Sequence, residues 1–128
     1  MTREVLTNSK HHFHVTAVHD GEEALCFVQR KAQYSEAPTP DLLVLDLNLP
    51  RRDGRAVLKE LKSDPKLSKI PVIVFTTSQA GSDISRCYDL GANCYLRKPG
   101  NLNEYRAVVQ SMAEFWCGFA SLPDKGRT

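Results

Sequence analysis

Three polar residues, Asp46, Thr76 and Lys98, each follow a short apolar segment of the chain. A carboxylate at the end of an apolar strand is costly to bury unless a cation or a donor pairs with it, and Lys98 is a candidate counter-charge for Asp46. A carboxylate beside a lysine and a hydroxyl can accept a phosphoryl group, because the carboxylate attacks phosphorus while the lysine offsets charge on the transferred oxygens. These residue types indicate acyl phosphate chemistry if the fold brings them together.

The segments that precede these residues are typical of buried strands. Residues 42–45, 70–75 and 94–96 are almost continuously apolar, which predicts strands of a parallel sheet covered on both faces. Residues 13–17 alternate between apolar and polar types and predict one more strand with a single buried face. Because sites in such folds lie beyond the carboxyl ends of the strands, the three polar residues fall where a site is expected.

Stretches with helical spacing separate the predicted strands. They predict a helix from Glu22 to about Gln33, a second that stops near residues 63–65, a third that stops at Gly91, and a long one from Asn101 to about Trp116. Strands that alternate with helices predict an α/β domain with right-handed crossovers.

Composition narrows the class of protein. The 128 residues suit one domain, and 41% apolar with 25% charged residues is ordinary globular usage. The net charge of +2, with both signs interspersed, forms no basic stripe, so nucleic acid is not an expected partner. No apolar run is long enough to cross a bilayer and the first ten residues lack a signal-peptide core, so we expect a cytoplasmic protein without membrane contact.

The thiol and imidazole side chains suggest structural roles. The four cysteines form no CxxC pair, and reduced thiols are favoured over disulfides or metal ligation: Cys26, Cys87, Cys94 and Cys117. Four histidines cluster near the predicted strand at residues 13–17, and exposed edge positions are favoured over a metal site: His11, His12, His14 and His19.

Three motifs together resemble the receiver domain of two-component response regulators. They are residues 43–54 (LVLDLNLPRRDG), 71–78 (PVIVFTTS) and 91–99 (GANCYLRKP), in the order and at the spacing of that family. The resemblance covers residues 11–117. The sequence of residues 46–50 and the Phe115-Trp116 pair near the C-terminus most resemble those of small stand-alone regulators that partner cyanobacterial phytochromes.

The resemblance implies a role for each site residue. Asp46 would be the phosphoacceptor and Thr76 the switch hydroxyl that moves toward the phosphoryl group, while Lys98 pairs with that group. Tyr95 would be the aromatic switch residue, and the Asp46 carboxylate with the Asn48 backbone carbonyl would be Mg²⁺ ligands.

Two further points accompany these roles. Thr77 competes with Thr76 for the switch role, and spacing alone favours Thr76. The Lys98-Pro99 bond is expected to be cis, as in the family.

Part of the family pattern has no counterpart in the sequence. The fold implied is a flavodoxin-like, doubly wound parallel sheet of order 2-1-3-4-5, yet neither its first, central strand nor the acidic pair that follows it is found. We therefore expect a receiver domain at residues 1–117 that is incomplete at its N-terminus, a tail at 118–128, and weak Mg²⁺ binding. A start further upstream, completion of the sheet by a second protomer, and a degenerate remnant are the three explanations.

The expected function is that of a phosphorelay response regulator. A sensor histidine kinase, with a phytochrome as the narrower candidate, would donate a phosphoryl group to Asp46. The signal would pass by protein contact or by homodimer formation, and the chain would not be an enzyme in the usual sense. The alternative is a degenerate receiver that acts as a phosphorylation-independent protein-binding module.

Overall fold

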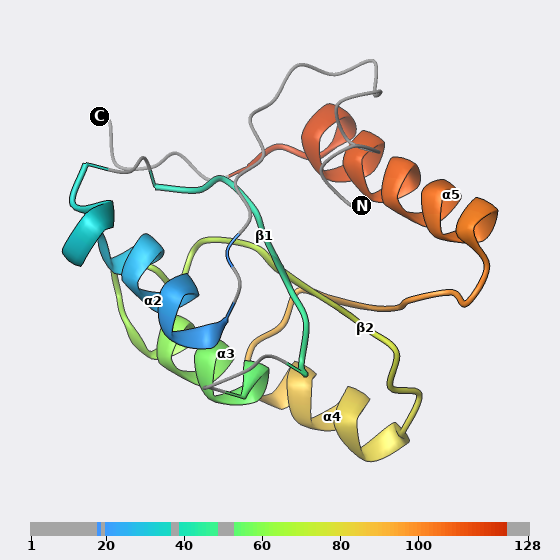
Figure 1. Ribbon diagram of the computed structural model, residues 1–128, viewed down its shortest axis with the longest axis horizontal. Coiled ribbons are helices and arrows are strands. Elements are labelled where there is room, and N and C mark those ends of the chain that lie inside the picture. Colours follow the sequence, from blue (N-terminus) through green and yellow to red (C-terminus); the bar gives the residue numbers. More distant parts are fainter. Residues whose placement is uncertain (1–17, 19, 37–38, 49–52, 123–128) are drawn as a thin grey trace. The chain divides into compact units, whose positions relative to one another are not determined.

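The computed structural model describes residues 18, 20–36, 39–48 and 53–122 (Figure 1). The elements in chain order are α2 (Gly21–Gln29), the 3₁₀ turn η1 (Ala32–Tyr34), β1 (Leu43–Leu45), α3 (Gly54–Ser63), β2 (Val72–Thr76), α4 (Gly81–Asp89), β3 (Cys94–Arg97), α5 (Leu102–Ala113) and the π-helical turn η2 (Glu114–Phe119). They fall into two compact units, residues 18–97 and residues 98–122, and each is described by itself.

The sheet of the first unit is parallel, as predicted. Its three described strands lie in the order β1-β2-β3, with Leu45 opposite Val74 and Thr76 opposite Arg97. The expected strand at residues 13–17 lies outside the described residues. The parallel arrangement expected from the sequence is therefore confirmed for these three strands.

The core of this unit lies where the helices meet the strands. Helices α2, α3 and α4 run along one side of the sheet (Figure 1). Apolar side chains from these helices and from the strands form one buried cluster, which includes Leu25, Leu58, Val74 and Cys87. Strand β2 is buried at all five positions, which agrees with its continuous apolar sequence.

Strand β1 departs from the prediction that both of its faces are covered. Leu45 is buried, but Val44 is 37% exposed. Among the described residues β1 has a neighbouring strand on one side only, so it lacks the second neighbour that a central strand would have.

Helix α2 is shorter than predicted. It begins at the cap formed by Asp20, whose Oδ1 accepts a hydrogen bond from the Glu23 N–H at 2.8 Å. The prediction that it reaches Gln33 is wrong, because Arg30 adopts a left-handed conformation with φ of 58° and ends the helix after Gln29. A separate 3₁₀ turn then carries the chain to Tyr34.

The carboxyl end of α3 is tied to two loops by one lysine. The Lys62 ammonium donates to the carbonyls of Ser68 and Ile70 at 3.0 and 2.9 Å and to Asn93 Oδ1 at 3.1 Å. Burial lowers the pKa of Lys62. Gly91 ends the α4 region as predicted, with φ of 108°, and a Cβ there would lie 2.8 Å from Lys62 Cγ.

The second unit consists mainly of α5 and the turn that follows it. Asn101, where the sequence predicts that this helix begins, caps α5 through its Oδ1, which accepts from the Asn103 and Glu104 N–H groups at 2.8 and 3.2 Å. The Phe115 and Trp116 rings of η2 meet edge to face at 5.4 Å. No described peptide bond is cis, so the expectation for Lys98-Pro99 is wrong in this structure.

Several other expectations can be compared with the described residues. None of the four cysteines forms a disulfide in this structure. Within the same part of the chain, no helix is long and apolar enough to cross a membrane. The four histidines of the metal hypothesis and residues 123–128 of the predicted tail lie outside it.

Candidate functional site

Asp46 directly follows β1 and begins the loop toward α3. Its side chain is half-buried, and Oδ1 accepts a hydrogen bond from the backbone N–H of Asn48 at 3.0 Å. Asp side chains favour this local turn because they bond to the backbone two residues further on. Leu47 is buried between them and anchors the loop to the core. The carboxylate is therefore held at the strand end in a defined orientation.

Gly54 allows α3 to begin directly against this loop. A Cβ at Gly54 would lie 2.4 Å from the backbone oxygen of Asp46 and 2.7 Å from Leu47 Cα. The Gly54 N–H also donates to the Leu47 carbonyl at 3.1 Å. In the sequence this glycine is only the last residue of the motif at residues 43–54. Its close approach to the candidate phosphoacceptor emerges from the tertiary structure alone.

Thr76 ends β2 with its hydroxyl fully buried. Its relative exposure is 0%, and Oγ1 has no hydrogen-bond partner among the described residues, whereas Thr77 is exposed. A buried polar group without a partner is unfavourable by about 1–3 kcal/mol. Because Leu45 pairs with Val74 in parallel, Asp46 and Thr76 leave adjacent strands at the same edge of the sheet. The structure thus brings these two predicted site residues to neighbouring strand ends.

Lys98 follows the last residue of β3, whose Arg97 lies opposite Thr76. It is also the first residue of the second unit, so its position is described only relative to residues 98–122. Convergence of Lys98 on Asp46 stays a prediction.

Tyr95 on β3 packs partly against the core and reaches the loop after β2. Its hydroxyl donates a hydrogen bond to the Ser78 carbonyl at 3.1 Å. The candidate aromatic switch residue is therefore bonded to a backbone group two residues beyond Thr76.

An ion pair that the sequence analysis did not single out lies beside this loop. The Ser78 hydroxyl donates to Asp83 Oδ2 at 2.6 Å, and Arg55 Nη2 lies 2.5 Å from Asp83 Oδ1. The Ser78 hydrogen bond and the Arg55 guanidinium lower the pKa of Asp83. The hydrogen bond to Asp83 in turn raises the pKa of Arg55. Because Arg55 and Asp83 lie 28 residues apart on different helices, no local pattern connects them.

The oxygen ligands described at Asp46 suit a magnesium site of low affinity. They are the Asp46 carboxylate and the exposed Asn48 backbone, as the sequence analysis proposed. No cluster of three or more His, Cys, Asp or Glu side chains occurs among the described residues. Mg²⁺ in proteins keeps several waters and uses one or two carboxylates, so a carboxylate and a carbonyl fit a water-rich ion of low affinity.

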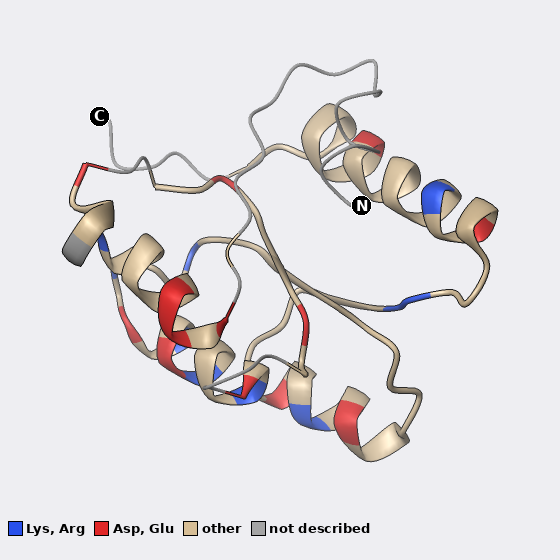
Figure 2. Ribbon diagram, in the orientation of Figure 1, with Lys and Arg blue, Asp and Glu red and all other residues tan. Residues whose placement is uncertain are grey.

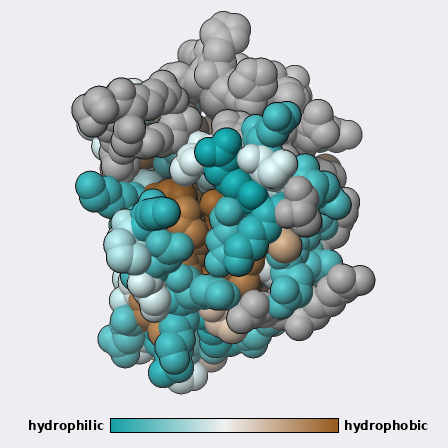
Figure 3. All heavy atoms as spheres, turned by 90° about the vertical axis from the view of Figure 1, so that its left-hand side faces the viewer, coloured by the Kyte–Doolittle hydropathy of each residue, from teal (hydrophilic) through white to brown (hydrophobic). Residues whose placement is uncertain are grey.

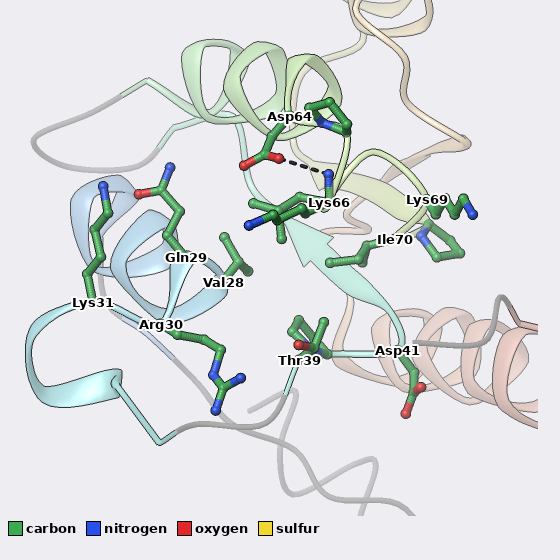
Figure 4. Close-up of a pocket in the computed structure, with 14 residues that line it drawn as sticks. Val28, Gln29, Arg30, Lys31, Thr39, Asp41, Asp64, Lys66, Lys69 and Ile70 are labelled. Atoms are coloured by element: carbon green, nitrogen blue, oxygen red, sulfur yellow. Dashed lines mark hydrogen bonds between the residues drawn. The ribbon is translucent and has the colours of Figure 1, made fainter. Parts of the chain in front are cut away.

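A separate hollow of about 700 Å³ lies at the opposite, amino end of the strands. Asp41 and Pro71, which precede β1 and β2, help to line it, together with Arg30 and Lys69 (Figure 4). Figure 3 shows apolar residues exposed within a hydrophilic rim on one face of the molecule. None of the predicted site residues lines the hollow.

Comparisons with known proteins agree with the architecture. The model of the response regulator receiver domain family matches residues 1–110. Response regulator Rcp1 of Synechocystis sp. is 42% identical over 96% of this chain and 84% of its own length. The probable methanogenesis regulatory protein FilR2 of Methanothrix harundinacea is 36% identical over 81% of this chain and 66% of its own.

Two solved structures are similar over nearly the whole chain. The phosphorylated cyanobacterial phytochrome response regulator RcpA superposes with a TM-score of 0.93 at 46% identity, over 96% of this chain and 88% of the other. The Mn²⁺-bound form of Rcp1 gives a TM-score of 0.93 at 41% identity, with the same coverage.

Proposed function

Since the chain belongs to the response regulator receiver domain family, we propose that its Asp46 carboxylate accepts a phosphoryl group from a sensor histidine kinase. The observation that carries this proposal is the pairing of two strand ends. One strand end presents a carboxylate held by the Asn48 N–H. The adjacent strand end presents the buried hydroxyl of Thr76, which has no hydrogen-bond partner among the described residues. A hydroxyl in that state is suited to donate to an oxygen of a phosphoryl group on Asp46.

The reaction needs little from the chain beyond position and charge. An Asp46 oxygen attacks phosphorus, the bond from phosphorus to the kinase histidine nitrogen breaks, and an aspartyl phosphate forms. The Asn48 N–H orients the carboxylate, and Lys98 offsets the negative charge of the phosphoryl oxygens. Mg²⁺, when bound, would neutralise part of the same charge. The Asp46 carboxylate and the Asn48 carbonyl would hold it, and we propose that it binds weakly.

We propose a phytochrome as the kinase and a protein contact as the output. RcpA, which is 46% identical, is described as a cyanobacterial phytochrome response regulator, and this supports the choice of kinase. A second copy of the chain is one candidate for the contacting protein. The chain itself would act as a switch. It would catalyse only the gain and loss of its own phosphoryl group, and so would not be an enzyme in the usual sense.

The alternative function is binding without phosphorylation. It is supported by the finding that no group of three or more His, Cys, Asp or Glu side chains among the described residues could hold a metal ion, which predicts weak metal binding and slow phosphoryl transfer. The same surface could then bind its partner whatever the state of Asp46.

Intact-mass analysis of the chain after incubation with acetyl phosphate and MgCl₂ tests the proposal. We expect one added phosphoryl group on the wild type and none on Asp46→Asn. Asp41→Asn is the matched control, because it makes the same chemical change at the other end of β1 and should be modified normally. An unmodified wild type, or an adduct that persists in Asp46→Asn, would favour the binding module.

A further inference from the structure

A continuous series of polar contacts connects β3 to α3 across the loop that follows Thr76. The Tyr95 hydroxyl donates to the Ser78 carbonyl, the Ser78 hydroxyl donates to Asp83, and Asp83 pairs with Arg55. We call this series the Arg55 bridge. Figure 2 shows acidic and basic residues along α3 and α4, the two helices that it joins.

The α3 end of the Arg55 bridge is fixed close to Asp46. Arg55 also pairs with Asp53, the cap of α3, at 3.1 Å. Between these two residues stands Gly54, which lies against the backbone of Asp46 so tightly that no side chain fits. Arg55 is therefore attached to the part of α3 that contacts the phosphoacceptor loop.

The other end of the bridge holds the segment that carries Thr76. Ser78 is two residues from Thr76, and both of its polar groups are engaged, the carbonyl by Tyr95 and the hydroxyl by Asp83. The Ser78 Oγ also accepts from the Ala80 N–H at 3.3 Å. A shift of this segment would break contacts with both β3 and α4, so the bridge opposes that shift.

The ion pair between Arg55 and Asp83 is partly buried and closely spaced, so it restrains the two helices that it joins. Only 29% of the Arg55 side chain and 24% of the Asp83 side chain are exposed. An arginine that binds two carboxylates through charge-assisted hydrogen bonds is more restrained than an isolated surface pair. The Ser78 hydrogen bond and the Arg55 guanidinium lower the pKa of Asp83, because both favour its charged carboxylate.

We propose that Arg55 is a positioning residue for the phosphoryl group: by holding Asp83, and through it Ser78, it favours the observed conformation, in which Tyr95 is bonded to the Ser78 carbonyl and the Thr76 hydroxyl has no partner among the described residues. This inference rests on the proposed function. An interaction made in only one of two conformations shifts their equilibrium toward that one. Any ligand that needs that conformation then binds more tightly. Removing the interaction therefore lowers the affinity for the ligand, even though the removed side chain does not contact the ligand.

The first experiment measures the affinity of the full chain for beryllofluoride, a phosphoryl mimic, in MgCl₂. The chain is labelled with 3-fluorotyrosine and followed by ¹⁹F NMR, in which Tyr95→Phe identifies the Tyr95 signal among the four tyrosines. We expect Arg55→Met to bind the mimic about threefold to tenfold more weakly, which is the size of effect expected when one contact of a connected network is removed. The Tyr95 signal of Arg55→Met should also move in the absence of ligand.

Arg86→Met is the matched control, because Arg86 is an exposed arginine on α4 and the chemical change is the same. Its affinity and its Tyr95 signal should equal those of the wild type. A merely structural role for Arg55 would lower stability and leave both quantities unchanged.

A double-mutant cycle tests whether Arg55 acts through Asp83. Asp83→Asn alone should weaken binding of the mimic, and adding Arg55→Met to it should cause little further loss. Fully additive losses, or equal binding by Arg55→Met and the wild type, would overturn the inference and leave the proposed function standing. Failure of the wild type to bind the mimic at all would overturn both.

Discussion

Replacing Thr76 with valine should stabilise the unmodified chain. Thr76 is fully buried, and its hydroxyl has no described partner, so the folded state carries the desolvation of that hydroxyl without a compensating hydrogen bond. Valine has nearly the same shape and replaces the hydroxyl by a methyl group. We expect the free energy of unfolding to rise by about 1–3 kcal/mol, which is the cost of a buried unsatisfied polar group.

The same substitution should act in the opposite direction once the site holds a phosphoryl group or its mimic. The Thr76 hydroxyl would then donate to a charged oxygen, a hydrogen bond worth about 1.5–3 kcal/mol. Valine cannot make this bond. The stabilisation that beryllofluoride and MgCl₂ confer on the wild type should therefore shrink in Thr76→Val by a similar amount.

Urea unfolding with and without beryllofluoride measures both effects. Thr77→Val is the control, because Thr77 is exposed and its change should stay within about 0.5 kcal/mol. A Thr76→Val chain that is less stable than the wild type without ligand would refute the reasoning, since it would show that the hydroxyl is already satisfied. An undiminished effect of the mimic would refute the switch role.

Three other outcomes follow from the described contacts. Gly54→Ala should lower the free energy of urea unfolding by about 1–3 kcal/mol through overpacking, whereas Gly81→Ala, with nothing within 4 Å of the new Cβ, should not. Lys62→Met should cost about 1–3 kcal/mol in the same assay because it removes the donor from two part-buried carbonyl groups, while Lys59→Met, at an exposed position of the same helix, should change little. The pKa of Asp83 is lowered in the folded state, so its stabilising contribution is present above its unfolded pKa and should disappear as the pH falls through the folded value. Thermal melts across that acidic range should show a smaller loss for Asp83→Asn than for the wild type.

The positions of the described strands could be predicted because burial on both faces requires continuous apolar residues. Strand β2 is the plainest case, since its five positions are all buried. The end of α2 could not be predicted in the same way. Apolar spacing continues past Gln29, and the helix ends because Arg30 adopts a positive φ that its residue type does not announce.

In the candidate site, too, some features could be predicted from the sequence and others depend on the tertiary structure. The sequence by itself determined the class of fold and which residues stand at the strand ends, because residue type and short-range period decide which segments are buried and where they stop. Tertiary structure alone decided that Gly54 contacts the Asp46 backbone and that Arg55 reaches Asp83 and, through it, Ser78. The Arg55–Asp83 contact joins residues 28 positions apart, and all of these contacts depend on how the helices pack against the strands and loops, which no local pattern encodes.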